Sequence, residues 1–89
     1  MDTLHLLRKD IDQIDREIVE LLVQRRDVVK KIADFKRKNK LPVFQKKREE
    51  EQKAQYETFA RQFQLSPRFL LELFATIQQN SREIQNESI

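Results

Sequence analysis

Apolar residues recur every three or four positions along the first third of the chain. They lie at Leu4, Leu7, Ile11, Ile14, Ile18, Leu21, Val28, Ile32 and Phe35. This spacing, called the apolar row below, predicts one helix that includes residues 4–36 and packs lengthwise against other helices. Asp2 and Thr3 are both plausible N-caps for it. The row is broken at Arg25, where an apolar residue is due. A guanidinium in an apolar row is costly unless an anionic group meets it, so Arg25 is a candidate binding residue.

This first helix is too long for a compact chain of its size. Its 33 residues span about 50 Å, whereas a compact chain of 89 residues has a diameter of about 30 Å. Part of the apolar row would therefore stay uncovered in a single copy. We expect a homodimer, in which a second copy packs along the same row by two-fold symmetry.

The first helix is expected to stop near Asn39, because Pro42 disfavours helix in the residue before it. A second, shorter helix is expected to begin near Phe44 or Gln45. Its first half, residues 45–53, contains no apolar residue. That half should face either solvent or a polar cavity, and the second half should anchor the helix. The apolar residues of the second half are Ala54, Tyr56, Phe59, Ala60 and Phe63.

A third helix is expected to begin at Ser66-Pro67, where a capping hydroxyl precedes a proline in the first helical position. The line of Phe74 and Ile77 along its apolar face continues into Ser81 and Gln85, which lie four residues apart and so share that face. Beyond Gln85 the chain is expected to fray.

The composition agrees with an all-α fold of three helices in a single domain over residues 1–89. The absence of glycine excludes glycine-rich phosphate loops, and the absence of cysteine excludes disulfides and thiolate chemistry. No apolar run approaches a membrane span, and the N-terminus is too charged for a signal peptide, so a cytoplasmic protein is expected. The net charge of +3 favours anionic partners only mildly.

Polar candidates lie on the inward faces of these helices. Arg25 and Lys36 are 11 residues apart, so they share one side of the first helix, about 16 Å apart along it. Arg8 lies about 42 Å from Lys36 along the same helix, and would meet it only across an antiparallel dimer. The other candidates are Arg48, Glu49, Ser81 and Gln85.

This set of side chains suits the binding of a small, multiply charged anion that carries a hydroxyl group. It does not suit nucleophilic, metal or histidine-based chemistry, so no metal or cofactor is expected. Taken singly, most of these candidates are commonest as ordinary surface residues, whereas for Arg25, inside the apolar row, a surface role and a site role are about equally common. Spacing and composition alone therefore predict a helical dimer, and they leave undecided whether it binds an anion.

An ordered series of short motifs runs through all three expected helices. Its members are Leu7-Arg8, Ile14-Asp15, Leu21-Leu22-x-x-Arg25-Arg26, Lys36, Pro42-Val43-x-x-x-x-Arg48-Glu49 and Phe74-x-x-Ile77-x-x-x-Ser81-x-x-x-Gln85. The whole series resembles the all-helical (type II) chorismate mutases over almost the entire chain. The resemblance implies an intertwined homodimer with two equivalent active sites, in which the long first helix spans both halves.

The resemblance also implies a reaction, the rearrangement of chorismate to prephenate in the biosynthesis of phenylalanine and tyrosine. In that family Arg25 and the partner's Arg8 would each bind one carboxylate of chorismate. Lys36 and Gln85 would donate hydrogen bonds to the ether oxygen whose bond breaks. The reaction is intramolecular, so electrostatic stabilisation and conformational restraint would suffice.

The remaining candidates receive binding roles from the same resemblance. Glu49 would accept a hydrogen bond from the ring hydroxyl, Arg48 would form part of the pocket wall, and Ser81 would lie near a carboxylate. Gln45 stands where the family often has Asp. Because the implied contact there is with the backbone, Gln45 is expected to be tolerated.

Several other functions fit parts of the sequence. Isochorismate–pyruvate lyase, which forms salicylate, is similar in fold. The position of Glu49, which would accept a hydrogen bond from the chorismate ring hydroxyl, favours the mutase. An aminated chorismate is a further candidate substrate. The nine Lys and Arg residues within 30–48 are a weak case for nucleic-acid binding, because they face several directions without interleaved aromatic residues. A regulatory protein, linked non-covalently to an enzyme of the same pathway, is a third class.

Overall fold

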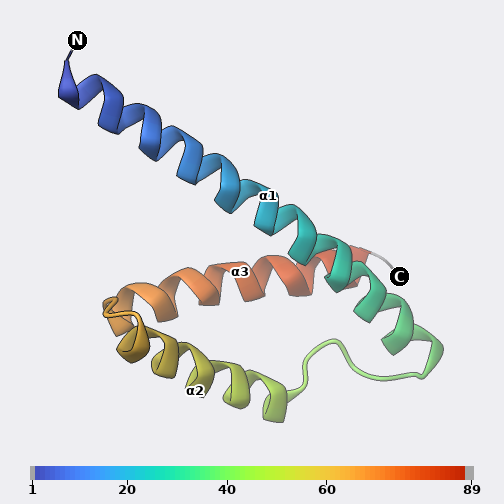
Figure 1. Ribbon diagram of the computed structural model, residues 1–89. Coiled ribbons are helices and arrows are strands. Elements are labelled where there is room, and N and C mark those ends of the chain that lie inside the picture. Colours follow the sequence, from blue (N-terminus) through green and yellow to red (C-terminus); the bar gives the residue numbers. More distant parts are fainter. Residues whose placement is uncertain (1, 88–89) are drawn as a thin grey trace.

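The computed structural model describes residues 2–87, which form three helices joined by two short linkers (Figure 1). The helices are α1 (Thr3–Lys38), α2 (Lys46–Gln62) and α3 (Pro67–Glu87). No strand occurs between residues 2 and 87, which confirms the all-α prediction. Helix α3 continues through Glu87, so the fraying expected beyond Gln85 does not occur within the described residues.

Side-chain caps fix where two helices begin. The Asp2 carboxylate accepts a hydrogen bond from the Leu4 backbone nitrogen at 3.0 Å. The Ser66 hydroxyl accepts one from the Phe69 backbone nitrogen at 3.2 Å. Each cap satisfies a backbone donor that has no partner inside its helix, so α1 and α3 begin where the sequence predicts.

Two residues other than glycine close the C-terminal ends of α1 and α2. Lys40 and Gln64 both have φ of 56°, the left-handed conformation that usually falls to glycine, which this chain lacks. After Lys40, the Leu41 nitrogen donates to the Lys36 carbonyl at 2.8 Å. This turn brings the first linker back toward the end of α1.

Helix α3 packs against both α1 and α2 (Figure 1). On α2 the anchoring residues are Tyr56 and Ala60, both buried, and the Tyr56 ring stacks on Phe74 with centroids 4.1 Å apart. The prediction that Ala54 and Phe63 also anchor α2 is wrong, because both side chains are exposed. Ala54 lies about 200° around the helix from Tyr56, and Phe63 lies at the C-cap, where α2 ends.

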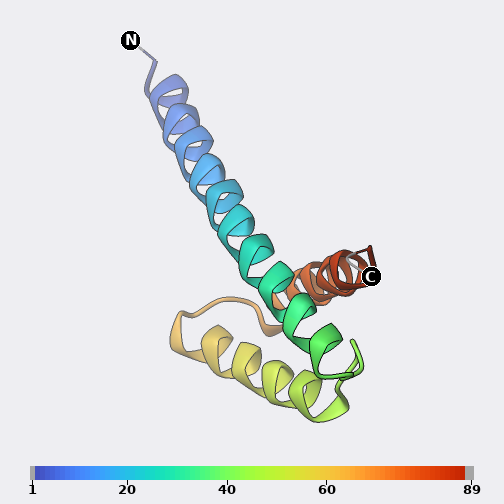
Figure 2. The ribbon, with the colours of Figure 1, turned by 90° about the vertical axis from the view of Figure 1, so that its right-hand side faces the viewer.

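The N-terminal half of α1 projects well beyond the pair formed by α2 and α3 (Figures 1 and 2). The chain measures 58 × 26 × 15 Å with a radius of gyration of 16.6 Å, whereas a compact chain of this length has about 12 Å. Along the apolar row, the exposed fraction is 55% at Leu7 and 62% at Leu21. No helix within residues 2–87 combines the length and apolar character of a membrane span.

Candidate active site

A cleft of about 430 Å³ lies among the C-terminal half of α1, the first linker, the start of α2 and the end of α3. Its volume falls within the range of about 300–1,000 Å³ that is usual for small-molecule sites. Four residues of the first half of α2 line the cleft, and the other residues of that half are exposed, so this half faces both the cleft and solvent. Of the eight candidate residues, seven line this cleft: Arg25, Lys36, Gln45, Arg48, Glu49, Ser81 and Gln85.

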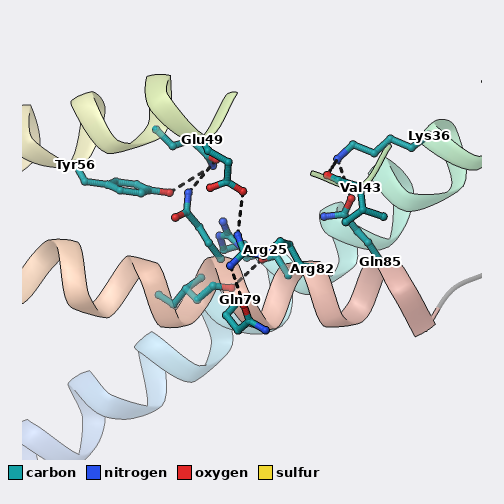
Figure 3. Close-up of polar contacts among 12 residues, drawn as sticks. Arg25, Lys36, Val43, Glu49, Tyr56, Gln79, Arg82 and Gln85 are labelled. Atoms are coloured by element: carbon teal, nitrogen blue, oxygen red, sulfur yellow. Dashed lines mark hydrogen bonds and ion pairs between the residues drawn. The ribbon is translucent and has the colours of Figure 1, made fainter. Parts of the chain in front are cut away.

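Lys36 and Gln85 form one unit in this cleft (Figure 3). The Lys36 ammonium donates to the Val43 carbonyl at 2.8 Å and to the Gln85 amide oxygen at 2.9 Å. An ammonium has three donors, so one remains for a ligand. Because the Gln85 oxygen is occupied, its amide nitrogen is turned toward the side of the cleft that holds Arg25 and Arg82 (Figure 3).

Burial also changes the pKa of this lysine. Desolvation lowers the pKa of the Lys36 ammonium below its ordinary value, and the negative charge of Glu49 acts in the opposite direction. Gln85 is 8% exposed. The unit therefore offers two donors, an ammonium and an amide, in a partly water-excluded place where hydrogen bonds to a developing charge are strong.

Arg25 reaches from α1 to α3. One guanidinium nitrogen donates to the Ser81 hydroxyl, and that hydroxyl donates to the Ile77 carbonyl at 3.0 Å. Ser81 is buried, so the contact fixes the guanidinium at the cleft wall. Because the guanidinium has five donors in a rigid fork, several remain for an anion. Arg25, where the apolar row is broken, therefore lies in the lining of the cleft.

Sequence reasoning missed Arg82. Its two terminal nitrogens donate to the Glu49 carboxylate at 3.0 Å and to the Gln79 amide oxygen at 2.8 Å (Figure 3). The available signal was spacing, since residues 78, 82 and 85 follow the i, i+4, i+7 pattern of one helix face.

A second missed pair closes the same wall. Gln78 of α3 donates to the Gln52 amide oxygen of α2 at 3.0 Å, and Gln52 donates to the Tyr56 hydroxyl at 3.4 Å. These amides and the Arg82–Glu49 pair join α2 to α3 through polar contacts. The apolar part of the lining comes from Val28, Val29, Ile32 and Val43.

The other candidates have looser surroundings. Arg8 is exposed on the projecting half of α1, outside the cleft of its own chain, so its role across a dimer stays a prediction. The Arg48 side chain is 60% exposed and lies 4.0 Å from Glu51. Gln45 is the N-cap residue of α2 but makes no capping hydrogen bond with its side chain.

The charge balance of the cleft favours a small anion. The lining contributes four cations, Arg25, Lys36, Arg48 and Arg82, and one carboxylate, Glu49. A cleft with this excess of positive charge favours anionic ligands. Within residues 2–87, no group of three acidic or histidine side chains lies close enough together to bind a metal ion.

Together, the fold and the cleft define an all-helical domain with a cationic site for a small polar anion. The chain matches the chorismate mutase type II family over residues 7–86, and it belongs to that family. It is also similar to a bifunctional chorismate mutase/prephenate dehydratase of Aquifex aeolicus (strain VF5), with 45% identity over 51 residues. That match covers 57% of this chain but only 14% of the relative's length.

Proposed function

We propose that this chain is a chorismate mutase that rearranges chorismate to prephenate on the route to phenylalanine and tyrosine. Membership of the type II family supports the reaction. The observation that carries the proposal is the Lys36–Gln85 unit, which places two hydrogen-bond donors in a cleft already rich in cations. The comparisons give no support to the isochorismate–pyruvate lyase alternative.

The chemistry explains why such a cleft suffices. In this rearrangement one carbon–oxygen bond breaks and one carbon–carbon bond forms within the same molecule, so no proton acceptor, nucleophile or metal takes part. Negative charge develops on the ether oxygen as its bond lengthens. The remaining Lys36 donor and the Gln85 amide nitrogen would stabilise that charge more than they stabilise the ground state.

The arginines would supply the restraint. Arg25, fixed against Ser81, would bind one carboxylate of chorismate. The partner's Arg8 would bind the second carboxylate and hold the enolpyruvyl arm over the ring. Restricting a flexible reactant to its reactive geometry lowers the barrier because the entropy is lost on binding.

The start of α2 would recognise the ring. Glu49 would accept a hydrogen bond from the ring hydroxyl, and Arg48 would form the wall beside it. Gln45 lines the same end of the cleft and would contribute through its backbone.

We further propose that two chains assemble along the apolar row. The chain exposes 7506 Å², whereas a compact protein of 10.8 kDa exposes about 5,500 Å². The surplus of about 2,000 Å² per chain suits an obligate homodimer interface. The partner's Arg8 has to reach a site between Arg25 and Lys36. Two antiparallel α1 helices related by a two-fold axis must therefore meet near residues 17–22, which lie halfway between residue 8 and that site.

A partner enzyme is also proposed. The relative's printed name joins a chorismate mutase with a prephenate dehydratase in one protein. For this chain we propose a non-covalent association with an enzyme that uses prephenate, since the product has to be converted further.

A product assay with two substrates tests the proposed reaction. Purified protein is incubated separately with chorismate and with isochorismate, and prephenate, salicylate and pyruvate are measured. We expect prephenate from chorismate, and no salicylate from isochorismate. Salicylate and pyruvate without prephenate formation would instead establish the lyase, and no turnover of either substrate would refute both activities.

A further inference from the structure

The carboxylate of Glu49 is held by a side chain to which the proposed reaction gives no role. Arg82 donates to one Glu49 oxygen at 3.0 Å, and its second terminal nitrogen donates to Gln79 at 2.8 Å (Figure 3). The Arg82 and Glu49 side chains are 31% and 26% exposed. The two residues come from different helices, so the contact fixes the start of α2 against α3.

This contact leaves Glu49 able to bind a hydroxyl. A carboxylate has two oxygens with about four lone-pair sites, and Arg82 occupies one of them. Because the guanidinium is a planar, rigid fork gripped at its other end by Gln79, it restricts the directions in which the carboxylate can point. A flexible glutamate is thereby converted into an acceptor of fixed direction.

Arg82 also compensates charge. Glu49 is the one carboxylate in the lining of a cleft that we propose binds a dianion. Without a neighbouring cation, that carboxylate would repel the ligand, and its partial burial would be costly. The ion pair lets the site keep a carboxylate acceptor next to a doubly negative ligand.

We infer that Arg82 is a positioning residue that aims Glu49 at the ring hydroxyl and so makes the site select substrates that carry this hydroxyl. The inference rests on the proposed function and deepens it. Its measurable consequence is a ratio, kcat/KM for chorismate divided by kcat/KM for the analogue in which hydrogen replaces the ring hydroxyl. Loss of charge alone would slow both substrates and leave this ratio unchanged.

The test measures that ratio in Arg82→Leu, Arg82→Lys and Glu49→Gln, and in the double variant Arg82→Leu/Glu49→Gln. We expect Arg82→Leu to lower the ratio about tenfold or more, the scale of one hydrogen bond to a charged group. Arg82→Lys, which keeps the charge but loses the fork, should give an intermediate ratio. The double variant should match Glu49→Gln, because Arg82 acts through that carboxylate.

A matched control is available on the same helix. Arg68 pairs with Glu72 at 3.0 Å, and its side chain is 88% exposed outside the cleft. Arg68→Leu therefore removes an ion pair of α3 and should leave the ratio unchanged. Circular dichroism and Tm would show whether Arg82→Leu folds, and if it does not, Arg82→Lys carries the comparison.

The outcomes separate this inference from the proposed function. If the unmodified protein converts chorismate but Arg82→Leu and Arg82→Lys keep its ratio, the inference is wrong and the proposed function stands. A double variant with a ratio well below that of Glu49→Gln would also overturn it, since Arg82 would then act independently. If the unmodified protein does not convert chorismate, the proposed function and this inference both fail.

Discussion

The proposed sharing of each site between two chains can be tested by mixing two inactive variants. Arg8 and Lys36 lie about 42 Å apart along one helix, and Arg8 lies outside the cleft of its own chain. In an antiparallel dimer, each site would combine Lys36 of one chain with Arg8 of the other. Arg8→Ala and Lys36→Ala homodimers would then have two defective sites each.

A mixed dimer of these two variants behaves differently. One site receives both substitutions, and the other receives neither. If equal amounts are unfolded together and refolded, half of the dimers are mixed and each has one intact site. We therefore expect about a quarter of the unmodified activity, from parents that are each about a hundredfold or more below it.

The assay is the rate of chorismate disappearance before and after joint refolding. The matched control mixes Arg25→Ala with Lys36→Ala. Those two residues belong to the same chain's cleft, so every site in that mixture stays defective and activity should not return. Recovery in the control, or no recovery with Arg8→Ala, would refute a site shared in this way, as would full activity of Arg8→Ala alone.

Three further outcomes follow from individual contacts. Burial lowers the Lys36 pKa below the ordinary lysine value of about 10.4. Because only the ammonium form donates, kcat/KM should fall as pH rises through this lowered pKa. A pH profile that is flat up to about 10.4 would contradict the role of Lys36 as a donor to the ether oxygen. Gln85→Glu should be active only in acid, since a protonated carboxyl can donate to the ether oxygen and a carboxylate cannot, so equal rates at mildly acidic and neutral pH would rule this out. Leu70 is 6% exposed, so Leu70→Ala should lower the free energy of unfolding in urea by about 2–5 kcal/mol. A loss below about 1 kcal/mol would show that the surroundings of Leu70 are not tightly packed.

Much of the fold follows from local information in the sequence. The spacing of apolar residues located α1 and the apolar face of α3, because one turn of helix repeats within a few residues, and Ser66-Pro67 located the start of α3. The caps at Asp2 and Ser66 were equally readable, since each bonds to a backbone nitrogen within three residues of itself. The left-handed conformations of Lys40 and Gln64 were not, because neither residue type favours them.

The site was only partly predictable. Arg25 and Gln85 could be assigned to the cleft because each occupies an inward position on its helix. Arg82 and Gln78 lie on the same face of α3. They belong to the site because they contact Glu49 and Gln52 of α2. That pairing depends on how α2 packs against α3, which helical periodicity does not specify. In a chain with 37% charged residues, a single arginine carries little signal of its own.

The central claim is that cationic and amide donors in one cleft stabilise charge on the ether oxygen of chorismate. The most direct test is kcat/KM for chorismate in Lys36→Ala, compared with Lys31→Ala, which removes an exposed lysine of α1 outside the cleft. We predict a loss of about 10²–10³ or more for Lys36→Ala and no loss for Lys31→Ala. If Lys36→Ala retains the unmodified kcat/KM, the cleft does not perform this chemistry as described.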